Sequence, residues 1–540
     1  MRTMRVARAR VRARGRNRAI CKMKYHAASP RPAPHFETQT MSVVAAPSRG
    51  ASASASARSR PSSSSARRAR HPATARPRSH PISSAVTSTE PASSSTAREP
   101  PRVLVLGGGF GGLYTALRLD ALDWTREGAP RPEITVVDRN DAFVFKPLLY
   151  ELVNETMEPW EVAPTFDDLL APTSNVTHVK GEVRSFAPDE GGETRDGTPC
   201  SSGGGTCALA DGTTLTYDYL VLALGTTTSD GGVVGARECA IGLNTERDAV
   251  RIARALRRLE DEGKRARVAV IGGGLSGVEL ASVIAERVNG KSSGGSVDVI
   301  TPNGKVMASA PFGQREAAMK VLQKDGVNVV GGRVSRLRKL GEDDSTSEAA
   351  VVFILDDRGN EREEEYDIVC WTVGQRAETP SDWPVLTTAA KKIKTDATLR
   401  VNGHSRIYAV GDASSSSADV MDANHDNLPS TAQVAFQQAD YAAWNIWASM
   451  NGRTELPFRY QHLGDMMVLG SLDAAVAFPV GDITLEGPAA AALRRLAYLY
   501  RMPTNEHRIK LGTKWIQDGI DQVQRDPTAF FEDIRKTFSP

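Results

Sequence analysis

Residues 102–112 read RVLVLGGGFGG, and this stretch decides the fold. Arg102–Leu106 is a short apolar run rich in β-branched residues, the pattern of a buried strand. A glycine turn and a helix-like stretch, Leu113–Leu122, follow it. A second apolar run, Ile134–Val137, ends in Asp138. A strand, a G-x-G-x-x-G turn, a helix and a second strand closed by an acid predict a βαβ unit that binds a dinucleotide.

Each glycine of this turn has a physical role. Gly107 allows the tight turn, Gly109 lets a pyrophosphate approach the backbone, and Gly112 lets the helix pack on the strand. The helix N-terminus offers free N–H groups to the anion, and Asp138 can accept hydrogen bonds from ribose hydroxyls. An insertion at residues 124–132 explains why Asp138 lies further along the chain than usual.

The same unit occurs a second time, which makes the motif specific. Arg267–Ile271 (RVAVI) leads into a turn with Gly272, Gly274 and Gly277, and the helical run Val278–Val288 follows. Two dinucleotide-binding units in one chain predict an α/β fold with two Rossmann-type domains, the first for FAD and the second for NAD(P)H.

Later apolar strands return to each unit. Tyr219–Gly225 (YLVLALG) and Ile368–Gly374 (IVCWTVG) both end in glycine, and Arg406–Asp412 closes in Gly-Asp. This pattern fits a flavin domain that is interrupted by an insertion and then resumed. We therefore expect five regions: a disordered transit peptide at 1–98, the FAD-binding domain at 99–240 and 386–470, the NAD(P)H-binding domain at 241–385, and a C-terminal amphipathic region at 471–540.

The first hundred residues differ in composition from the rest. They are rich in Arg, Ser, Ala and Pro, and their only acids are Glu37, Glu90 and Glu99. Such a stretch cannot bury enough apolar surface to fold, and it is typical of an organelle transit peptide. The alternative is a basic arm that binds nucleic acid, although the acidic body argues against nucleic-acid partners. The dense arginines of residues 1–18 favour a mitochondrion, and the later Ser/Ala stretch favours a plastid.

Other classes of site are excluded by the residues present. The five cysteines form no C-x-x-C pair, which argues against a zinc ribbon or dithiol redox chemistry. No metal site is expected. Cys370 lies within an apparent buried strand, where packing is its expected role. No run of 18 apolar residues exists, so a membrane-spanning helix is not expected.

From about residue 100 to 520 the chain resembles the alternative, or type II, NAD(P)H–quinone oxidoreductases of the plant, algal and cyanobacterial branch. The matching stretches are VLGGGFGGLYTALRL, FVFKPLLYEL, LVLALG, VIGGGLSGVELA, WTVG, IYAVGDAS and TAQVAFQQADY. The resemblance implies a pyridine-nucleotide-disulfide-reductase-like flavoprotein with FAD as cofactor and NADPH or NADH as substrate. In this family a hydride passes to FAD and electrons pass to a membrane prenylquinone, of the plastoquinone or naphthoquinone type, without proton pumping.

The resemblance also carries over the site residues, position by position. The FAD side is matched by Gly107, Gly109, Gly112, Asp138, Lys146, Pro147, Gly225 and Asp412. The nicotinamide side is matched by Gly272, Gly274, Gly277, Thr301, Gly374 and the catalytic candidate Glu279. The A-Q-x-x-x-Q signature, where flavin meets quinone, is matched by Ala432, Gln433 and Gln437. The two glutamines share one helix face and are expected to bond a quinone carbonyl; the alternative is a satisfied amide pair.

One departure concerns the choice of donor. Sites that prefer NADH usually end the second strand in an acid, but here Val297–Ile300 is followed by Thr301-Pro302-Asn303. The missing carboxylate and the nearby Lys305 predict that NADPH is accepted at least as well as NADH. The alternative is that Asp298 or a distant side chain discriminates between the two.

The C-terminal stretch has an amphipathic pattern. In Pro488–Arg501 an apolar stripe is formed by Leu493, Leu496, Ala497 and Tyr500, with Arg494, Arg495 and Arg501 off it. Residues 507–520 add Ile509, Leu511, Trp515, Ile516 and Ile520 among basic residues. Such helices can lie in a bilayer interface, which suits a lipid-soluble quinone. The alternative is a helix that packs on the core or on a second subunit.

Two other functions stay open on the sequence alone. A sulfide–quinone or disulfide reductase would need redox cysteines near the flavin, and a non-enzymatic flavoprotein would sense NAD(P)H and signal to a partner. The expected location is the chloroplast, peripheral to the thylakoid membrane or a plastoglobule, with the mitochondrion as an alternative or second target. The resemblance also allows a homodimer.

Overall fold

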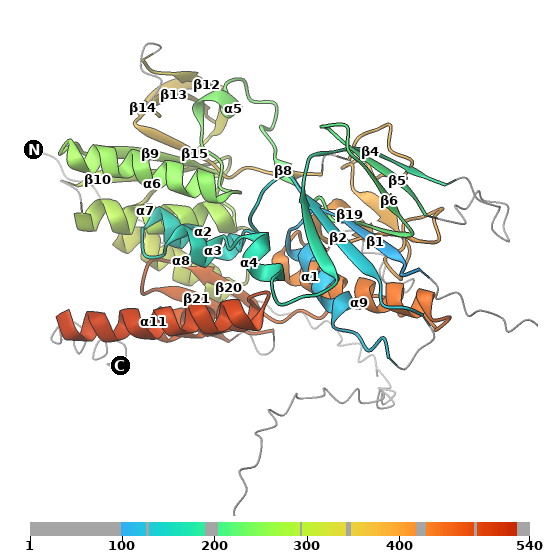
Figure 1. The fold of residues 1–540 in the computed structure, drawn as a ribbon. Helices are drawn as coiled ribbons and strands as arrows, with labels where there is room; N and C mark the ends of the chain where they lie inside the picture. Colours follow the sequence, from blue (N-terminus) through green and yellow to red (C-terminus); the bar gives the residue numbers. More distant parts are fainter. Residues whose placement is uncertain are drawn as a thin grey trace, which may run out of the picture. The chain divides into compact units, whose positions relative to one another are not determined.

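The computed structural model describes residues 99–125, 129–189, 204–291, 294–341, 347–377, 379–416, 428–479 and 483–525 (Figure 1). The expected leader at 1–98 lies outside the described residues. The described chain contains two parallel sheets. In each of them, the strand that comes first in the sequence leads into a glycine turn.

The first parallel sheet takes its strands from two distant parts of the sequence. Its order is β18–β7–β1–β2–β3. The strands are β1 (Arg102–Leu106), β2 (Glu133–Asp138), β3 (Val176–Lys180), β7 (Tyr219–Leu222) and β18 (Ile407–Ala409). Helices α1 (Phe110–Asp120) and α9 (Ala432–Met450) pack against each other beside this sheet (Figure 1). A parallel sheet needs helical cover, and here that cover also comes from both parts of the sequence.

The second parallel sheet lies in the intervening segment and has the order β11–β10–β9–β15. Its strands are β9 (Ala266–Ile271), β10 (Gly295–Thr301), β11 (Asn328–Gly331) and β15 (Ile368–Trp371). Its helices are α6 (Glu246–Asp261), α7 (Leu275–Lys291) and α8 (Phe312–Lys324). Thr245 caps the N-terminus of helix α6, and its hydroxyl accepts a hydrogen bond from the Asp248 N–H in a capping box.

One antiparallel sheet is inserted before β7 of the first parallel sheet, and another is inserted before β15, the last strand of the second. The first insertion is β4 (Val183–Pro188), β5 (Gly205–Leu209) and β6 (Thr214–Tyr217); the second is β12 (Arg333–Lys339), β13 (Ala350–Leu355) and β14 (Glu361–Tyr366). Two short pairs complete the connections: β8 (Thr227–Thr228) with β16 (Gln375–Arg376), and β17 (Ile393–Thr395) with β19 (Ser414–Ser416). The β8–β16 pair joins the two places where the chain crosses between the parallel sheets.

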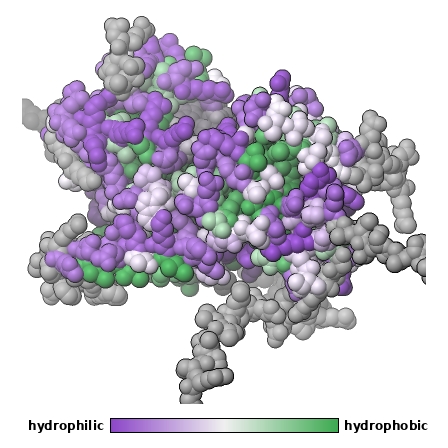
Figure 2. All heavy atoms as spheres, in the orientation of Figure 1, coloured by the Kyte–Doolittle hydropathy of each residue, from purple (hydrophilic) through white to green (hydrophobic). Residues whose placement is uncertain are grey.

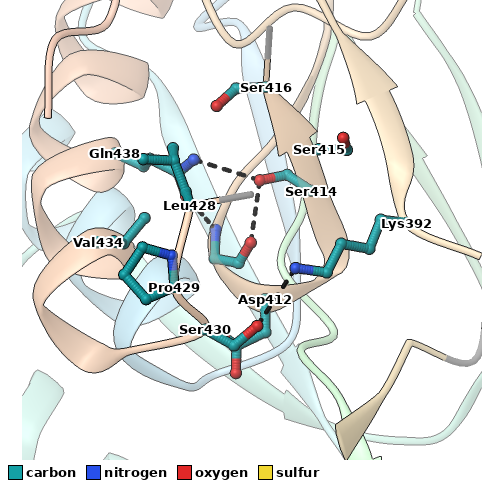
Figure 3. Close-up of a pocket in the computed structure, with 11 residues that line it drawn as sticks. Lys392, Asp412, Ser414, Ser415, Ser416, Leu428, Pro429, Ser430, Val434 and Gln438 are labelled. Carbon is teal, nitrogen blue, oxygen red and sulfur yellow. Dashed lines mark hydrogen bonds between the residues drawn. The ribbon is translucent and has the colours of Figure 1, made fainter. Parts of the chain in front are cut away.

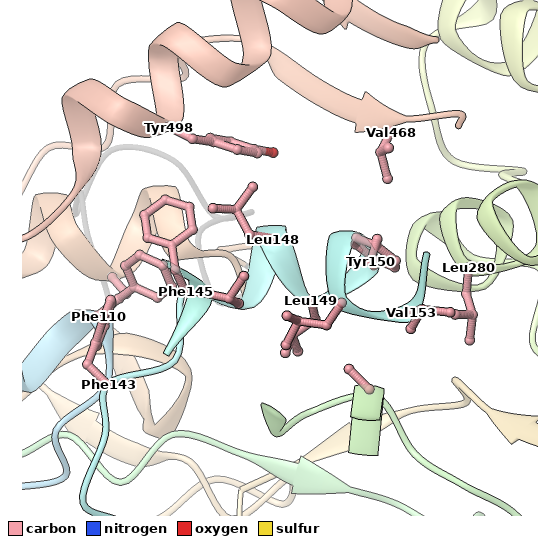
Figure 4. Close-up of a cluster of buried hydrophobic side chains, with 14 of the residues drawn as sticks. Phe110, Phe143, Phe145, Leu148, Leu149, Tyr150, Val153, Leu280, Val468 and Tyr498 are labelled. Carbon is pink, nitrogen blue, oxygen red and sulfur yellow. The ribbon is translucent and has the colours of Figure 1, made fainter. Parts of the chain in front are cut away.

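Short helices fill the connection from β2 to β3. They are η1 (Lys146–Leu148), α2 (Leu149–Val153), α3 (Pro159–Val162) and α4 (Phe166–Leu170). We call residues 149–155 the α2 segment. Figure 4 shows Leu149, Tyr150 and Val153 of this segment between Tyr498 on one side and Leu280 of α7 on the other. These side chains belong to one buried cluster that includes residues of both parallel sheets.

The C-terminal part is a small sheet with two helices. Its elements are β20 (Asp465–Val468), β21 (Ala474–Ala477), β22 (Thr484–Glu486), α10 (Gly487–Arg501) and α11 (Asn505–Arg525). Helix α10 packs on β21. The sheet begins at Asp465, so a domain boundary at 470/471 falls between its first two strands. Among the described helices, none has the length and apolarity needed to cross a bilayer.

The close packing at the first turn leads to a stability prediction. A Cβ on Gly112 would lie 1.8 Å from the Gly107 carbonyl oxygen, whereas one on Gly109 would meet no heavy atom within 4 Å. We expect Gly112→Ala to lower the free energy of unfolding by about 3 kcal/mol or more, because the backbone must shift. Gly109→Ala, the matched control, should cost less than about 1 kcal/mol. Denaturant titrations followed by circular dichroism measure both; equal costs would contradict the packing argument.

Candidate functional site

The first glycine turn is tied to the end of β2. The Gly107 N–H donates to the Val137 carbonyl at 2.8 Å, and Gly107 has a φ of 103°, which favours glycine. The Gly108 N–H donates to Asp138 Oδ2 at 2.7 Å. Asp138 therefore lies directly beside the turn. The space around the Gly109 Cβ position is open, which is the feature that a pyrophosphate needs to approach the backbone.

The second glycine turn repeats this geometry at the end of β10. The Gly272 N–H donates to the Ile300 carbonyl at 2.9 Å, and Gly272 has a φ of 115°. A Cβ on Gly277 would lie 1.9 Å from the Gly272 carbonyl oxygen, and one on Gly274 would meet nothing within 4 Å. The two turns thus share the tight first glycine, the open middle glycine and the packed third glycine. Both fit the diphosphate of a dinucleotide.

Thr301 stands where Asp138 stands in the first unit. Each follows directly after the residue whose carbonyl accepts from the first glycine. The Thr301 side chain lies against the turn, 3.0 Å from the Cβ position of Gly273. Asp298, the alternative discriminator, accepts hydrogen bonds from Asn328 Nδ2 and the Tyr366 hydroxyl, both at 2.8 Å. Its carboxylate is therefore committed to the sheet and not to the glycine turn.

The ends of both sheets meet at one place. Gly225 and Gly374 follow β7 and β15 with φ values of 71° and 70°. The hydroxyl of Thr226 lies 2.9 Å from Gln375 Oε1 and 3.3 Å from Asp412 Oδ2. The structure therefore brings together three motifs that are widely separated in the sequence.

Asp412 lies in the short helix η2 (Gly411–Ala413), which is held by a residue that the sequence analysis missed. Gln438 of α9 accepts from the Gly411 N–H at 2.6 Å and donates to Ser414 Oγ at 3.3 Å. Figure 3 shows these groups around a small pocket that Lys392 and Asp412 also line. Gln438 is buried. In the sequence, the only sign of its role is that a polar residue stands on the inner face of a helix.

Lys146 and Pro147 form the start of η1, with Lys146 exposed and Pro147 half-buried. The α2 segment continues from them. The buried Tyr150 is hydrogen-bonded to Glu279 of α7, two residues after Gly277. Glu279 also accepts from the Val468 N–H at 3.0 Å. Burial raises the pKa of Glu279 to about 7, so this carboxyl can exchange a proton near neutral pH.

The two glutamines of the A-Q-x-x-x-Q stretch are occupied by the chain itself. Gln433 donates to the Gly464 carbonyl at 3.0 Å and accepts from the Tyr460 hydroxyl and the Leu463 N–H, both at 2.8 Å. Gln437 donates to the Gln461 carbonyl at 2.8 Å and accepts from the Gln461 N–H at 2.9 Å. In the described chain both amides therefore fasten residues 460–464 to α9, and their expected contact with a quinone carbonyl stays a prediction.

Ala432 is the first residue of α9, next to the capping Thr431. It and Gln433 precede Gln438, which holds the Gly411 N–H next to Asp412, by about one and a half turns of α9.

The described cysteines offer no dithiol. Cys207, Cys239 and Cys370 are all free, and burial raises the pKa of the Cys370 thiol to about 12. Within the described ranges no group of His, Cys, Asp and Glu side chains could hold a metal ion. The arrangement therefore lacks what a disulfide or metal mechanism would need from these residues, and it offers two nucleotide turns and a buried carboxyl.

Comparisons with known proteins agree with this geometry. Residues 101–439 match the family described as pyridine nucleotide-disulphide oxidoreductase. The chain is 43% identical over 444 residues to an alternative NAD(P)H-ubiquinone oxidoreductase, chloroplastic/mitochondrial, of Arabidopsis thaliana, covering 78% of this chain and 82% of that one. It is 38% identical over 440 residues to the demethylphylloquinone reductase NdbB of a Synechocystis strain, covering 79% and 99%.

Solved structures show the same fold. NDH2 of Plasmodium falciparum in complex with NADH matches with a TM-score of 0.62 at 16% identity, over 77% of this chain and 98% of that chain. The sulfide:quinone oxidoreductase of Aquifex aeolicus matches with a TM-score of 0.57 at 19% identity, over 74% and 90%. At these identities the likeness concerns the fold alone.

Proposed function

The chain belongs to the pyridine nucleotide-disulphide oxidoreductase family and, within it, to the alternative NAD(P)H–quinone oxidoreductases, and from that premise we propose that it oxidises NAD(P)H and reduces a membrane prenylquinone with FAD as its cofactor. The observation that carries the proposal is the pair of matching glycine turns whose sheets end together at Thr226, Gln375 and Asp412. Two dinucleotides bound at these turns would have their reactive rings directed to one place.

When bound, FAD supplies the two-electron chemistry that links a hydride donor to a quinone. The chain's own residues bind the two dinucleotides and orient them. The N–H groups at the start of α1 and α7 would hold the two diphosphates, and Asp138 would hold a ribose beside the first turn. Gly225, Gly374 and Asp412 shape the place where the two sheets end. The overall reaction takes up one proton with each hydride, and Glu279 can hold that proton because its pKa is about 7.

The quinone is proposed from the relatives' names and from the chain's expected location. The Arabidopsis relative is named for ubiquinone and the Synechocystis relative for demethylphylloquinone. We favour plastoquinone or a naphthoquinone for this chain. The described cysteines are all free, which argues against a sulfide or disulfide substrate.

Rapid-mixing spectroscopy of the two half-reactions tests this function. We expect NADPH to bleach the flavin absorbance anaerobically and a prenylquinone in detergent to restore it within one turnover. The flavin of a Gly109→Asp variant should be lost, because a carboxylate would repel the diphosphate. Bleaching without reoxidation by plastoquinone, naphthoquinone or ubiquinone would favour the sensor function and contradict quinone reduction.

The equivalence of Thr301 and Asp138 supports NADPH as a donor. A carboxylate at the end of the second strand, such as Asp138 in the first unit, can accept a hydrogen bond from the ribose 2′-OH. A threonine at the same position, such as Thr301, does not repel a 2′-phosphate. Lys305, four residues later, is exposed beside the second turn. We therefore propose that NADPH is accepted at least as well as NADH.

A charge substitution at this position measures the preference. A carboxylate about 4 Å from a 2′-phosphate costs roughly 1–4 kcal/mol. Thr301→Asp should therefore lower the NADPH/NADH ratio of kcat/KM by about fivefold to several hundredfold, while the matched uncharged variant Thr301→Asn should leave it nearly unchanged. A wild-type protein that strongly prefers NADH would contradict the assignment.

The C-terminal helices present an apolar face outward. The exposed residues are Leu493, Leu496 and Tyr500 on α10 and Ile509, Ile516 and Ile520 on α11. Figure 2 shows hydrophobic residues along the edge that α11 occupies in Figure 1. The rest of the expected stripe differs, because Leu511 is buried and Trp515 is half-buried, where its indole N–H donates to Glu161 Oε1 at 3.2 Å. We propose that the outward face lies on the membrane that holds the quinone.

Flotation with vesicles tests the membrane face. The triple variant Ile509→Ser, Ile516→Ser and Ile520→Ser should no longer float with liposomes of phosphatidylcholine and phosphatidylglycerol, and it should still bind flavin. The control replaces equally exposed apolar residues elsewhere, Val234→Ser with Leu386→Ser, and should float like the wild type. Loss of flotation in both, or in neither, would contradict the assignment.

The location follows from the leader and the relative. The Arabidopsis relative is named as chloroplastic/mitochondrial, and residues 1–98 have a transit-peptide composition. We propose a plastid location, peripheral to the thylakoid or a plastoglobule, with the mitochondrion as a second target. We also propose that the protein is a homodimer, which a measurement of its molecular mass in solution tests.

A further inference from the structure

A buried ion pair joins the α2 segment to α10. Arg494 Nη2 lies 2.6 Å from Glu151 Oε1, and the two side chains are only 1% and 3% exposed. Glu151 also accepts from Thr156 Oγ1 at 2.7 Å and lies 3.7 Å from Arg495 Nη2. Burial opposes the charge on Glu151, but the two arginines outweigh it and hold the pKa of Glu151 below its ordinary value.

Removing a pair of charges from water is costly, and Arg494 is satisfied only in part. Its Nε and Nη1 groups are buried and have no hydrogen-bond partner among the described residues. A structural clamp between two helices would not need a guanidinium with spare donors. Its position therefore calls for a reason beyond packing.

Glu279 is the other acid on which the positive charge of Arg494 acts. The groups that act on Glu279 are the Tyr150 hydroxyl from α2, the Val468 N–H from β20 and the charge of Arg494 from α10. Tyr498 of α10 is also near it, with its ring 5.3 Å from the Arg494 guanidinium carbon. Tyr150 is hydrogen-bonded in turn to Ser276, which is exposed in the first turn of α7 next to the second glycine turn.

The charges of this cluster balance in only one state. With Glu151, Arg494 and Arg495 charged, the cluster is neutral when Glu279 is ionised, and it carries one positive charge when Glu279 is protonated. An opposite charge nearby favours the ionised form of a buried acid. Arg494 therefore works against the desolvation that would otherwise keep Glu279 permanently protonated.

We propose that Arg494, anchored by Glu151, is a positioning residue of the reaction that supplies the buried counter-charge against which Glu279 takes up and releases its proton. This rests on the proposed function, in which NAD(P)H, a quinone and one proton become NAD(P)⁺ and a quinol. Arg494 itself touches neither nucleotide nor quinone in this role. It acts through Glu279.

Two substitutions at the same contact separate this role from a structural one. Arg494→Met removes the counter-charge, so the titration of Glu279 should move to higher pH by about one pH unit. Glu151→Gln leaves the arginine uncompensated, so the titration should move to lower pH by a similar amount. A merely structural contact would be broken equally by both variants and would give shifts in one direction. Arg494→Lys keeps the charge and should stay near the wild type.

The readout does not depend on turnover. The titration of Glu279 is followed by its protonated-carboxyl infrared band in the flavin-loaded protein without donor or quinone, with Glu279→Gln to assign the band. The pH profile of flavin reoxidation by quinone provides the second readout and should move with the band. The control Arg287→Met breaks the ion pair of another fully buried arginine, which lies on α7 and contacts Glu260 at 2.7 Å, and should leave the Glu279 band in place.

Opposite shifts for Arg494→Met and Glu151→Gln support the proposal. Parallel shifts, or no shift of the Glu279 band in either, overturn it. If Arg494→Met fails to fold, the direction of the Glu151→Gln shift alone decides. A protein that the donor does not bleach, or that no quinone reoxidises, refutes the proposed function but leaves the infrared titration interpretable.

Discussion

The constraint on which the structure depends is the contact between the first and third glycines of each turn. In both units a side chain on the third glycine would come within 2 Å of the first glycine's carbonyl oxygen. Each parallel sheet is thus bound directly to the helix that follows its first strand. The contact leaves the middle glycine open and points the N-termini of α1 and α7 outward, so one packing requirement creates both places where a diphosphate can be held.

The α2 segment connects these two places to the C-terminus. Its residues bond to α7 at several points: Tyr150 to Glu279, Asn154 to Glu286 at 3.1 Å, and the Val153 carbonyl to Arg287 at 2.7 Å. Glu151 bonds to α10 on the other side. The helix that follows the second glycine turn and the helix with the outward apolar face are therefore held by the same five-residue helix.

Local patterns predicted the parts of the fold that depend on local physics. The run Arg102–Leu106 is β1 as expected, the second copy begins one residue earlier than Arg267, and the α/β class with a pyridine-nucleotide-disulfide-type fold is confirmed. These elements follow from hydrophobic period and from glycine chemistry, which a short window of sequence contains. The sequence also showed that Thr301 replaces a carboxylate, because the position at the end of one strand can be read from that strand alone.

What the sequence could not predict depends on partners far along the chain. Arg494 lies off the apolar stripe, as expected. It faces the core, however, because it pairs there with the buried Glu151, which is 343 residues away in the sequence. Gln433 and Gln437 share a helix face as expected, but their amides are used by residues 460–464. Gln438 had no pattern to single it out. Buried polar contacts of this kind have no period in the sequence, so only the folded chain reveals them.

The most direct test is a structure of the protein determined with FAD and NADP⁺ bound. The account predicts the FAD diphosphate against Gly107–Gly112 with a ribose on Asp138. It predicts the NADP⁺ diphosphate against Gly272–Gly277, with the 2′-phosphate beside Thr301. Density for only one dinucleotide, or the flavin at the second turn, would contradict it.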